Sequence, residues 1–173
     1  MNIFDQYLTF LSRIDAETSR VSQRLSNELR CGPGCNDCCM SFSVLPLEAA
    51  FLAHNLTLNS QTRRQARSAA EISNRCPFLA GGLCLVYAHR PIICRTQGLP
   101  IAYVDEEREA VIVSACELNF PADRSSFAEE ELLFLDPFNQ ELAELNSAFA
   151  AQRGDKDAIR RIPLRHIASG TGG

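Results

Sequence analysis

The eight cysteines constrain the fold of this chain more than any other feature of its sequence. Four fall within nine residues, three more form a second block, and one stands apart: Cys31, Cys35, Cys38 and Cys39; Cys76, Cys84 and Cys94; and Cys116. A metal held by thiolates needs several sulfur atoms to converge on one point. The segment Gly32-Pro33-Gly34 suits that need, because glycine adopts the positive φ angles that let a chain curl around an ion.

The compartment expected for the chain favours metal chemistry over disulfides. The segment Met1–Phe10 contains Asp5 and lacks a basic region, so it does not resemble a signal peptide. No stretch of 18 apolar residues predicts a membrane span. We therefore expect a cytoplasmic protein, in whose reducing surroundings clustered cysteines more often bind metals or do redox chemistry than form structural disulfides.

All eight cysteines are thus candidate metal ligands, and their number leaves two arrangements open. Eight thiolates can fill two four-thiolate sites, or hold one cluster and leave thiols to spare. An all-cysteine set suits zinc as well as iron, the latter mononuclear or in an iron–sulfur cluster. Because neighbouring side chains tend to point in different directions, we expect the adjacent Cys38 and Cys39 to serve different metals, or one of them to lie outside the ligand shell.

Arginine and histidine residues near the cysteines are further candidates for a role at the metal site. Arg30, Arg75 and Arg95 each adjoin a cysteine, where a guanidinium would offset the negative charge of a thiolate site; three solvated arginines are the alternative. Arg95 has no acceptor to offer a metal, so we expect it to act through its charge and hydrogen bonds. His89 lies between Cys84 and Cys94, and a structural role is favoured for it because thiolates already outnumber the ligands required.

The remaining pattern predicts one domain over residues 1–173, mainly α-helical with a small β-hairpin. N- and C-terminal helices are expected to flank an irregular, metal-stabilised cysteine-rich core. The expected parts are an N-terminal helix, a cysteine-cluster metal-binding module, C-terminal helices and a flexible tail, over residues 1–30, 31–116, 117–165 and 166–173.

Periodicity and capping residues set the expected elements. Asn2 and Asp5 form a capping pair for the first helix, and prolines open two others. Helices are expected over residues 46–55, 60–72 and 136–153, the last closed by Gly154, with a short one starting at the acidic run 129–131. Loops and turns are expected between Gly81 and Pro100. Apolar segments over residues 101–104 and 110–113 flank a charged turn and predict the hairpin.

The net charge of the chain excludes some classes of binding partner from the prediction. The net charge is -4 and no basic stripe is present, which argues against nucleic acid and against an anionic membrane surface as the partner. The predicted partner is a metal ion. A protein partner stays open, without a feature that would identify it.

Two blocks of the sequence resemble a known family. Cys35-x2-Cys38-Cys39 is followed by Cys76-Pro77-Phe78-Leu79 and by Gly82-x-Cys84-x-Val86-Tyr87-x2-Arg90-Pro91-x2-Cys94-Arg95. Together they resemble the YkgJ-type CxxCxxCC family of zinc- or iron-chelating domains, over about half the chain. The resemblance implies metal ligation first by Cys35, Cys38, Cys39, Cys84 and Cys94, then by Cys31 and Cys76, and last by Cys116. In one departure, three residues rather than two separate Cys31 from Cys35.

The sequence therefore indicates a metal-binding protein that chelates zinc or iron through its cysteine cluster. Two other classes of function stay open. One is a cluster-dependent transferase or oxidoreductase, which would need an open coordination position. The other is a thiol–disulfide switch, in which loss of metal lets Cys38 or Cys39 pair with a distant cysteine. Spacing alone assigns no catalytic residue and no cofactor besides the metal.

Overall fold

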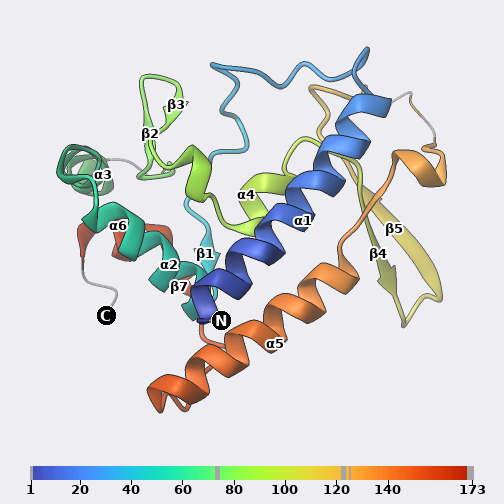
Figure 1. Cartoon of the computed structure of the whole chain (residues 1–173). Helices are drawn as coiled ribbons and strands as arrows, with labels where there is room; N and C mark the ends of the chain where they lie inside the picture. Colours follow the sequence, from blue (N-terminus) through green and yellow to red (C-terminus); the bar gives the residue numbers. More distant parts are fainter. Residues whose placement is uncertain (1, 73–74, 122–123, 125, 171–173) are drawn as a thin grey trace.

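A computed structural model describes residues 2–72, 75–121, 124 and 126–170. Within these residues the chain forms six α-helices, so the prediction of a mainly α-helical protein is confirmed (Figure 1). The helices are α1 (Ile3–Arg24), α2 (Pro46–Thr57), α3 (Ser60–Ile72), α4 (Ile92–Thr96), α5 (Asp136–Arg153) and α6 (Leu164–Ser169). Single 3-10 turns lie at η1 (Tyr87–His89) and η2 (Glu129–Glu131).

The strands are short and form three small sheets among the described residues. They are β1 (Ser43–Val44), β2 (Leu79–Ala80), β3 (Leu83–Cys84), β4 (Ile101–Asp105), β5 (Ala110–Ser114), β6 (Leu133–Phe134) and β7 (Ile162–Pro163). The predicted hairpin is confirmed as the antiparallel pair β4–β5, and β6 adds to it in parallel alongside β4. The pairs β1–β7 and β2–β3 are both antiparallel.

Helix α1 begins as predicted but ends early. Asn2 and Asp5 form a reciprocal capping box, in which each side chain accepts the other residue's backbone N–H. The helix ends at Arg24, so the predicted helix over residues 1–30 is too long, and residues 25–28 form turns instead. Ser26 and Asn27 favour this ending, because their short polar side chains compete for backbone hydrogen bonds.

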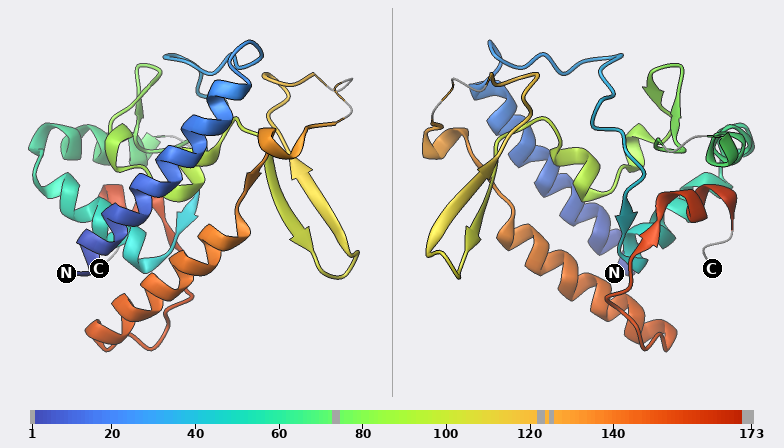
Figure 2. Two further views of the ribbon diagram at one scale, coloured as in Figure 1. Left: turned by 45° about the vertical axis from the view of Figure 1, so that its right-hand side comes forward. Right: turned by 180° about the vertical axis from the view of Figure 1, so that it is seen from behind.

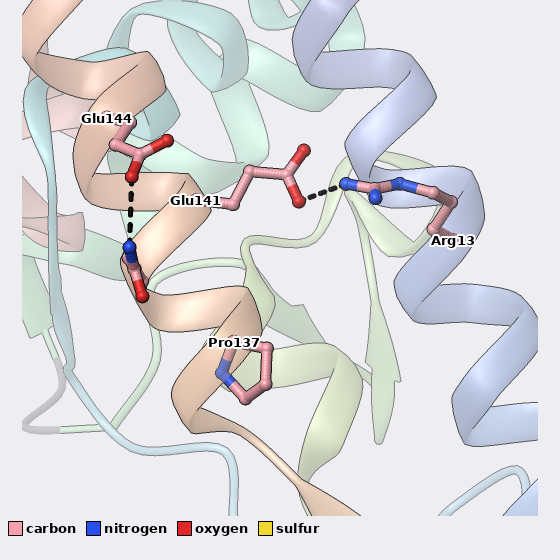
Figure 3. Close-up of a pocket in the computed structure, with 5 residues that line it drawn as sticks. Arg13, Pro137, Glu141 and Glu144 are labelled. Atoms are coloured by element: carbon pink, nitrogen blue, oxygen red, sulfur yellow. Dashed lines mark hydrogen bonds and ion pairs between the residues drawn. The ribbon is translucent and has the colours of Figure 1, made fainter.

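Helices α1 and α5 lie side by side (Figures 1 and 2). Phe4 of α1 stacks on Phe149 of α5, with 6.3 Å between ring centroids. Figure 3 shows an open surface hollow elsewhere between these two helices, where Arg13 of α1 forms an ion pair with Glu141 of α5. Apolar packing together with a charged edge is the pattern expected for two amphipathic helices.

Helix α2 contributes to two separate apolar cores. We call them the central core, which α1, α4 and α5 share, and the lateral core, which includes residues of α3 and α6. Leu47 and Phe51 point into the central core, whereas Leu52 and Leu56 are buried in the lateral core. A helix that is apolar around most of its circumference is expected to be enclosed in this way.

A buried carboxylate joins α2 to α4. Glu48 is 3% exposed; its Oε2 accepts the N–H of Leu45 at 3.1 Å, and its Oε1 accepts the N–H of Ile92 at 3.1 Å. The Tyr7 hydroxyl donates a third hydrogen bond. Burial raises the pKa of Glu48, while the two backbone donors lower it. Because Ile92 is the first residue of α4, this carboxylate fixes where that helix begins.

Several predictions for the middle and end of the chain need correction. Residues 81–100, expected as loops and turns, include β3, η1 and α4. Residues 117–165, expected as helices, also contain the strands β6 and β7, which pair with β4 and β1. Of the predicted flexible tail, residues 166–169 belong to α6 because Ile167 and Ala168 are buried in the lateral core. Residues 171–173 lie outside the described part of the chain.

None of the helices in the described ranges combines the length and apolar character that crossing a bilayer requires.

Candidate metal centre

All eight cysteines are free thiols. They lie on an irregular segment over residues 29–42, on the β2–β3 hairpin and the turn before it, on α4, and on the loop after β5. Figure 1 shows that the irregular segment, in light blue, runs across the top of the molecule. The β2–β3 hairpin lies toward one end of it and the loop after β5 toward the other (Figures 1 and 2). The fold therefore presents cysteines from distant parts of the sequence along one edge.

Four of these thiols lie close enough to influence one another, and we call them the inner group: Cys39, Cys76, Cys84 and Cys94. Burial, followed by the charges of Cys76 and Cys84, raises the pKa of the Cys94 thiol far above its ordinary value. Burial likewise raises the pKa of Cys76 to about 11, with Cys84 and Cys39 adding to the effect. Thiols that raise one another's pKa in this way are neighbours in space.

Backbone contacts hold the inner group together. The N–H of Cys76 donates to the carbonyl of Cys39 at 3.3 Å, and Met40 and Arg75 form an isolated bridge beside it. Cys84 ends β3, which returns along β2 through Gly81 and Gly82. Both glycines have positive φ, 56° and 79°, as a two-residue turn between antiparallel strands requires.

Arg90 supplies positive charge to the inner group. Its guanidinium lies 3.6 Å from the centroid of the Tyr87 ring, and its Nη1 donates to the carbonyl of Cys94 at 3.2 Å. The Arg90 charge lowers the pKa of Cys84, Cys94 and Cys39, and so opposes the effect of burial. Sequence reasoning placed Arg90 in a turn and missed this role, since three residues separate it from Cys94 in the sequence.

The arginines singled out by adjacency behave differently from one another. Arg75 lowers the pKa of Cys39, and its Nη2 donates to the carbonyl and Oδ1 of Asn36 at 2.6 and 2.7 Å. Arg95 instead donates through Nη1 to both carboxylate oxygens of Asp15 on α1 at 2.6 Å, and through Nε and Nη2 to two backbone carbonyls at 2.7 Å. Arg95 therefore ties α4 to α1. The contact found at Arg30 comes from its backbone N–H.

The other four thiols form what we call the outer group: Cys31, Cys35, Cys38 and Cys116. Burial raises the pKa of Cys31, and the charges of Cys35 and Cys116 raise it further. Burial and the charge of Cys39 raise the pKa of Cys38, to which Cys35 and Cys116 also contribute. The two groups thus meet at the adjacent Cys38 and Cys39, whose side chains are hydrogen-bonded to each other, and the other thiol charges that act on them come from Cys35 and Cys116 for Cys38 and from Cys84 for Cys39.

A buried asparagine holds the outer group in place. Asn119 is 3% exposed; its Nδ2 donates to Cys31 Sγ at 3.2 Å and to the carbonyl of Gly98 at 2.6 Å. The hydrogen bond from Asn119 lowers the pKa of Cys31 and so favours the thiolate. The N–H of Asn119 also donates to the carbonyl of Cys116 at 3.0 Å. One residue therefore contacts both ends of the group, and no sequence motif marks it.

Histidine does not join either group through the contacts observed. The His89 ring packs edge-on against Phe51, with 6.0 Å between centroids, and the backbone N–H of His89 donates to the carbonyl of Val86 at 2.8 Å. Burial, and then the charge of Arg95, lowers the pKa of His89. These contacts support a structural part for His89.

The cysteine sulfur atoms of each group are not arranged as a metal-binding site requires. Among the residues that the structure describes, no three His, Cys, Asp or Glu side chains are arranged so that they could hold a metal ion as they stand. The type and number of donors nevertheless fit a thiolate-bound metal, because each group supplies four sulfur atoms. Binding would require the sulfur atoms of a group to move closer together.

Comparison with known proteins places this cysteine-bearing region in a family. The CxxCxxCC family model, described as "Putative zinc- or iron-chelating domain", matches residues 30–117. The chain belongs to the CxxCxxCC family. The match begins one residue before Cys31 and ends one residue after Cys116, so the CxxCxxCC domain includes every cysteine of both groups. The searches of curated proteins and of solved structures gave no match.

Within the CxxCxxCC domain, the Gly98→Ala variant is expected to disturb the outer group. Gly98 has φ of 94°, and an added Cβ would lie 2.8 Å from Cys31 Sγ and 3.3 Å from Asn119 Nδ2. We expect the free energy of unfolding to fall by about 2 kcal/mol, from backbone strain and from displacement of Cys31. Thermal denaturation measures the change.

Gly154→Ala is the matched control for that variant. Gly154 also has positive φ, 66°, but an added Cβ there would meet nothing within 4 Å. It should show the cost of the backbone strain alone, about 1 kcal/mol. Equal destabilisation by the two substitutions would mean that the close approach of the added Cβ to Cys31 does not lower the free energy of unfolding.

Proposed function

We propose that this protein chelates zinc or iron at two centres, one at the inner group and one at the outer group. The observation that carries the proposal is a pair of contacts between distant parts of the sequence: a backbone hydrogen bond sets Cys76 beside Cys39, and Asn119 contacts both Cys31 and Cys116, which supports two sets of four thiols. Four thiolates complete a tetrahedral zinc site and equally suit an iron–sulfur cluster. Membership of the CxxCxxCC family supports the same two metals.

The surroundings of the inner group support thiolate ligation there. Burial alone disfavours a charged thiolate, so an unpartnered cluster of four partly buried sulfurs would stay protonated. A bound cation supplies the charge that reverses this preference, since the ligands must be deprotonated to bind it. Arg90 and Arg75 offset part of the negative charge that remains.

The adjacent cysteines provide the sharpest test of two centres. Cys38→Ser should hold half the metal of the wild-type protein, because it removes a ligand of the outer group alone. Cys39→Ser should hold no more than half, because it removes a ligand of the inner group. Elemental analysis after anaerobic purification gives the metal content, and visible absorption distinguishes an iron–sulfur cluster from colourless zinc.

Two results would contradict the proposal of two metal centres. If Cys38→Ser keeps its fold by circular dichroism yet loses all metal, the adjacent thiolates share one centre and the division into two is wrong. If the wild-type protein binds neither zinc nor iron when reconstituted with each, the proposal fails as a whole.

A further inference from the structure

We infer that the two centres differ in lability: the outer group exchanges its metal with incoming thiols, whereas the inner group retains its metal as part of the fold. This inference rests on the proposed function, because it requires a metal at each group. The inner and outer groups differ in how exposed their cysteines are. Cys31 and Cys35 are exposed, whereas none of the four inner cysteines is, and Cys76 and Cys84 pack against the lateral core.

The inner ligands are fastened to the rest of the molecule. Cys84 belongs to the β2–β3 hairpin, and Cys94 lies on α4. That helix is held at its first residue by the buried carboxylate of Glu48, and at Arg95 by the ion pair with Asp15 on α1. An inner thiolate that left the metal would stay beside it, so lasting release requires part of the fold to open.

The outer ligands are held unevenly. Asn119 fixes the sulfur of Cys31. Cys35 lies in a turn of the irregular segment, where its N–H donates to the carbonyl of Gly32 at 3.0 Å and the side chain of Asn36 donates to that of Gly34 at 3.0 Å. Local bonds of this kind shape the turn, and Arg75 anchors it through the neighbouring Asn36, whereas the Cys35 side chain itself is exposed and bonds to Cys31 of the same group. Cys35 is therefore the ligand best placed to leave.

The exchange itself is a ligand substitution without redox change. With a metal bound, the thiolate of a small thiol would take the coordination position that Cys35 Sγ gives up, and Cys35 would take up the proton that the incoming thiol lost. Further substitutions remove the metal from the remaining outer ligands in the same manner. Access of the incoming sulfur to the metal sets the rate, so exposure at Cys31 and Cys35 favours the outer group.

Release kinetics from the zinc-loaded full chain test the inference. Zinc is released to the dye 4-(2-pyridylazo)resorcinol at several concentrations of glutathione. We expect two phases of equal amplitude that differ by about tenfold or more in rate, which corresponds to a difference of about 1.4 kcal/mol in activation free energy. The fast phase should accelerate in proportion to glutathione, and Cys38→Ser should show the slow phase alone.

Alkylation of the wild-type protein gives a second readout that needs no substitution. With N-ethylmaleimide present during release, peptide mass spectrometry should find Cys35 alkylated in the fast phase, before Cys94. A single phase from a chain that holds two zinc ions, or alkylation of Cys94 first, would overturn the inference while the proposed function stands. A wild-type chain that fills fewer than two centres, whether reconstituted with zinc or with iron, would instead contradict the proposed function, and the inference with it.

Discussion

The Cys94→Ser variant is expected to lose the metal of the inner group and to unfold at a much lower temperature than the wild-type protein. Cys94 is the inner thiol on α4, a helix bound to both α1 and α2. A structural thiolate-bound metal contributes on the order of 10 kcal/mol to folding, and loss of one of four ligands should forfeit about half of that. In a chain of this length, a loss of about 5 kcal/mol lowers the melting temperature by about 10–20 °C.

Two controls separate the metal from the side chain itself. Cys35→Ser removes an exposed ligand of the outer group and should lower the melting temperature far less. Metal-free samples of the wild-type protein and of Cys94→Ser should melt within a few degrees of one another, since neither then gains from coordination. If Cys94→Ser retains wild-type metal content and melting temperature, Cys94 is not a ligand.

The Glu48→Gln variant should show the second-largest effect, although Glu48 binds no metal in our proposal. The carboxylate accepts hydrogen bonds from two backbone N–H groups and from the Tyr7 hydroxyl, at a position that is 3% exposed. The amide of glutamine has a single oxygen. At least one of these three donors would then lie opposite the amide NH2, which cannot accept its hydrogen bond. We expect a loss of about 3 kcal/mol in the free energy of unfolding, measured by urea denaturation.

Asp5→Asn is the matched control, because the Asp5 carboxylate likewise accepts a backbone N–H from three residues earlier, that of Asn2, but at an exposed position. It should cost about 0.5 kcal/mol. Glu48→Gln should also increase the alkylation rate of Cys94, since α4 loses the contact that fixes its first turn. An unchanged stability would show that the buried carboxylate does not hold α4 in place.

Local signals in the sequence were sufficient for the long elements of the fold. The capping pair Asn2–Asp5, the proline at the start of α2, and Gly154 after α5 each act within a few residues, and all three helices begin where predicted. Helix α4 could not be predicted in the same way. It has five residues, and its first N–H is bonded to Glu48, 44 positions away in the sequence. The pairing of β6 with β4 likewise depends on the tertiary fold.

The make-up of the candidate metal centre likewise depends on contacts that local sequence signals do not predict. Spacing made all eight cysteines candidate ligands, which stays a prediction, and the adjacency of Cys38 and Cys39 suggested different environments for them. The composition of each group depends on pairings that bring residue 39 beside residue 76 and residue 31 beside residue 119. Asn119 and Gly98 carry no motif, so only the folded chain reveals that they surround Cys31. Which metal each group binds stays a prediction.

The assignment of Cys38 and Cys39 to different groups has a consequence for the order in which the protein matures. A chain leaves the ribosome from its N-terminus, so the inner group is complete once Cys94 has emerged, while Cys31, Cys35 and Cys38 still await Cys116. In the proposed scheme the nascent chain therefore acquires its retained metal first. The labile centre can form only after the β4–β5 hairpin has been synthesised, on a scaffold that the earlier metal has already set.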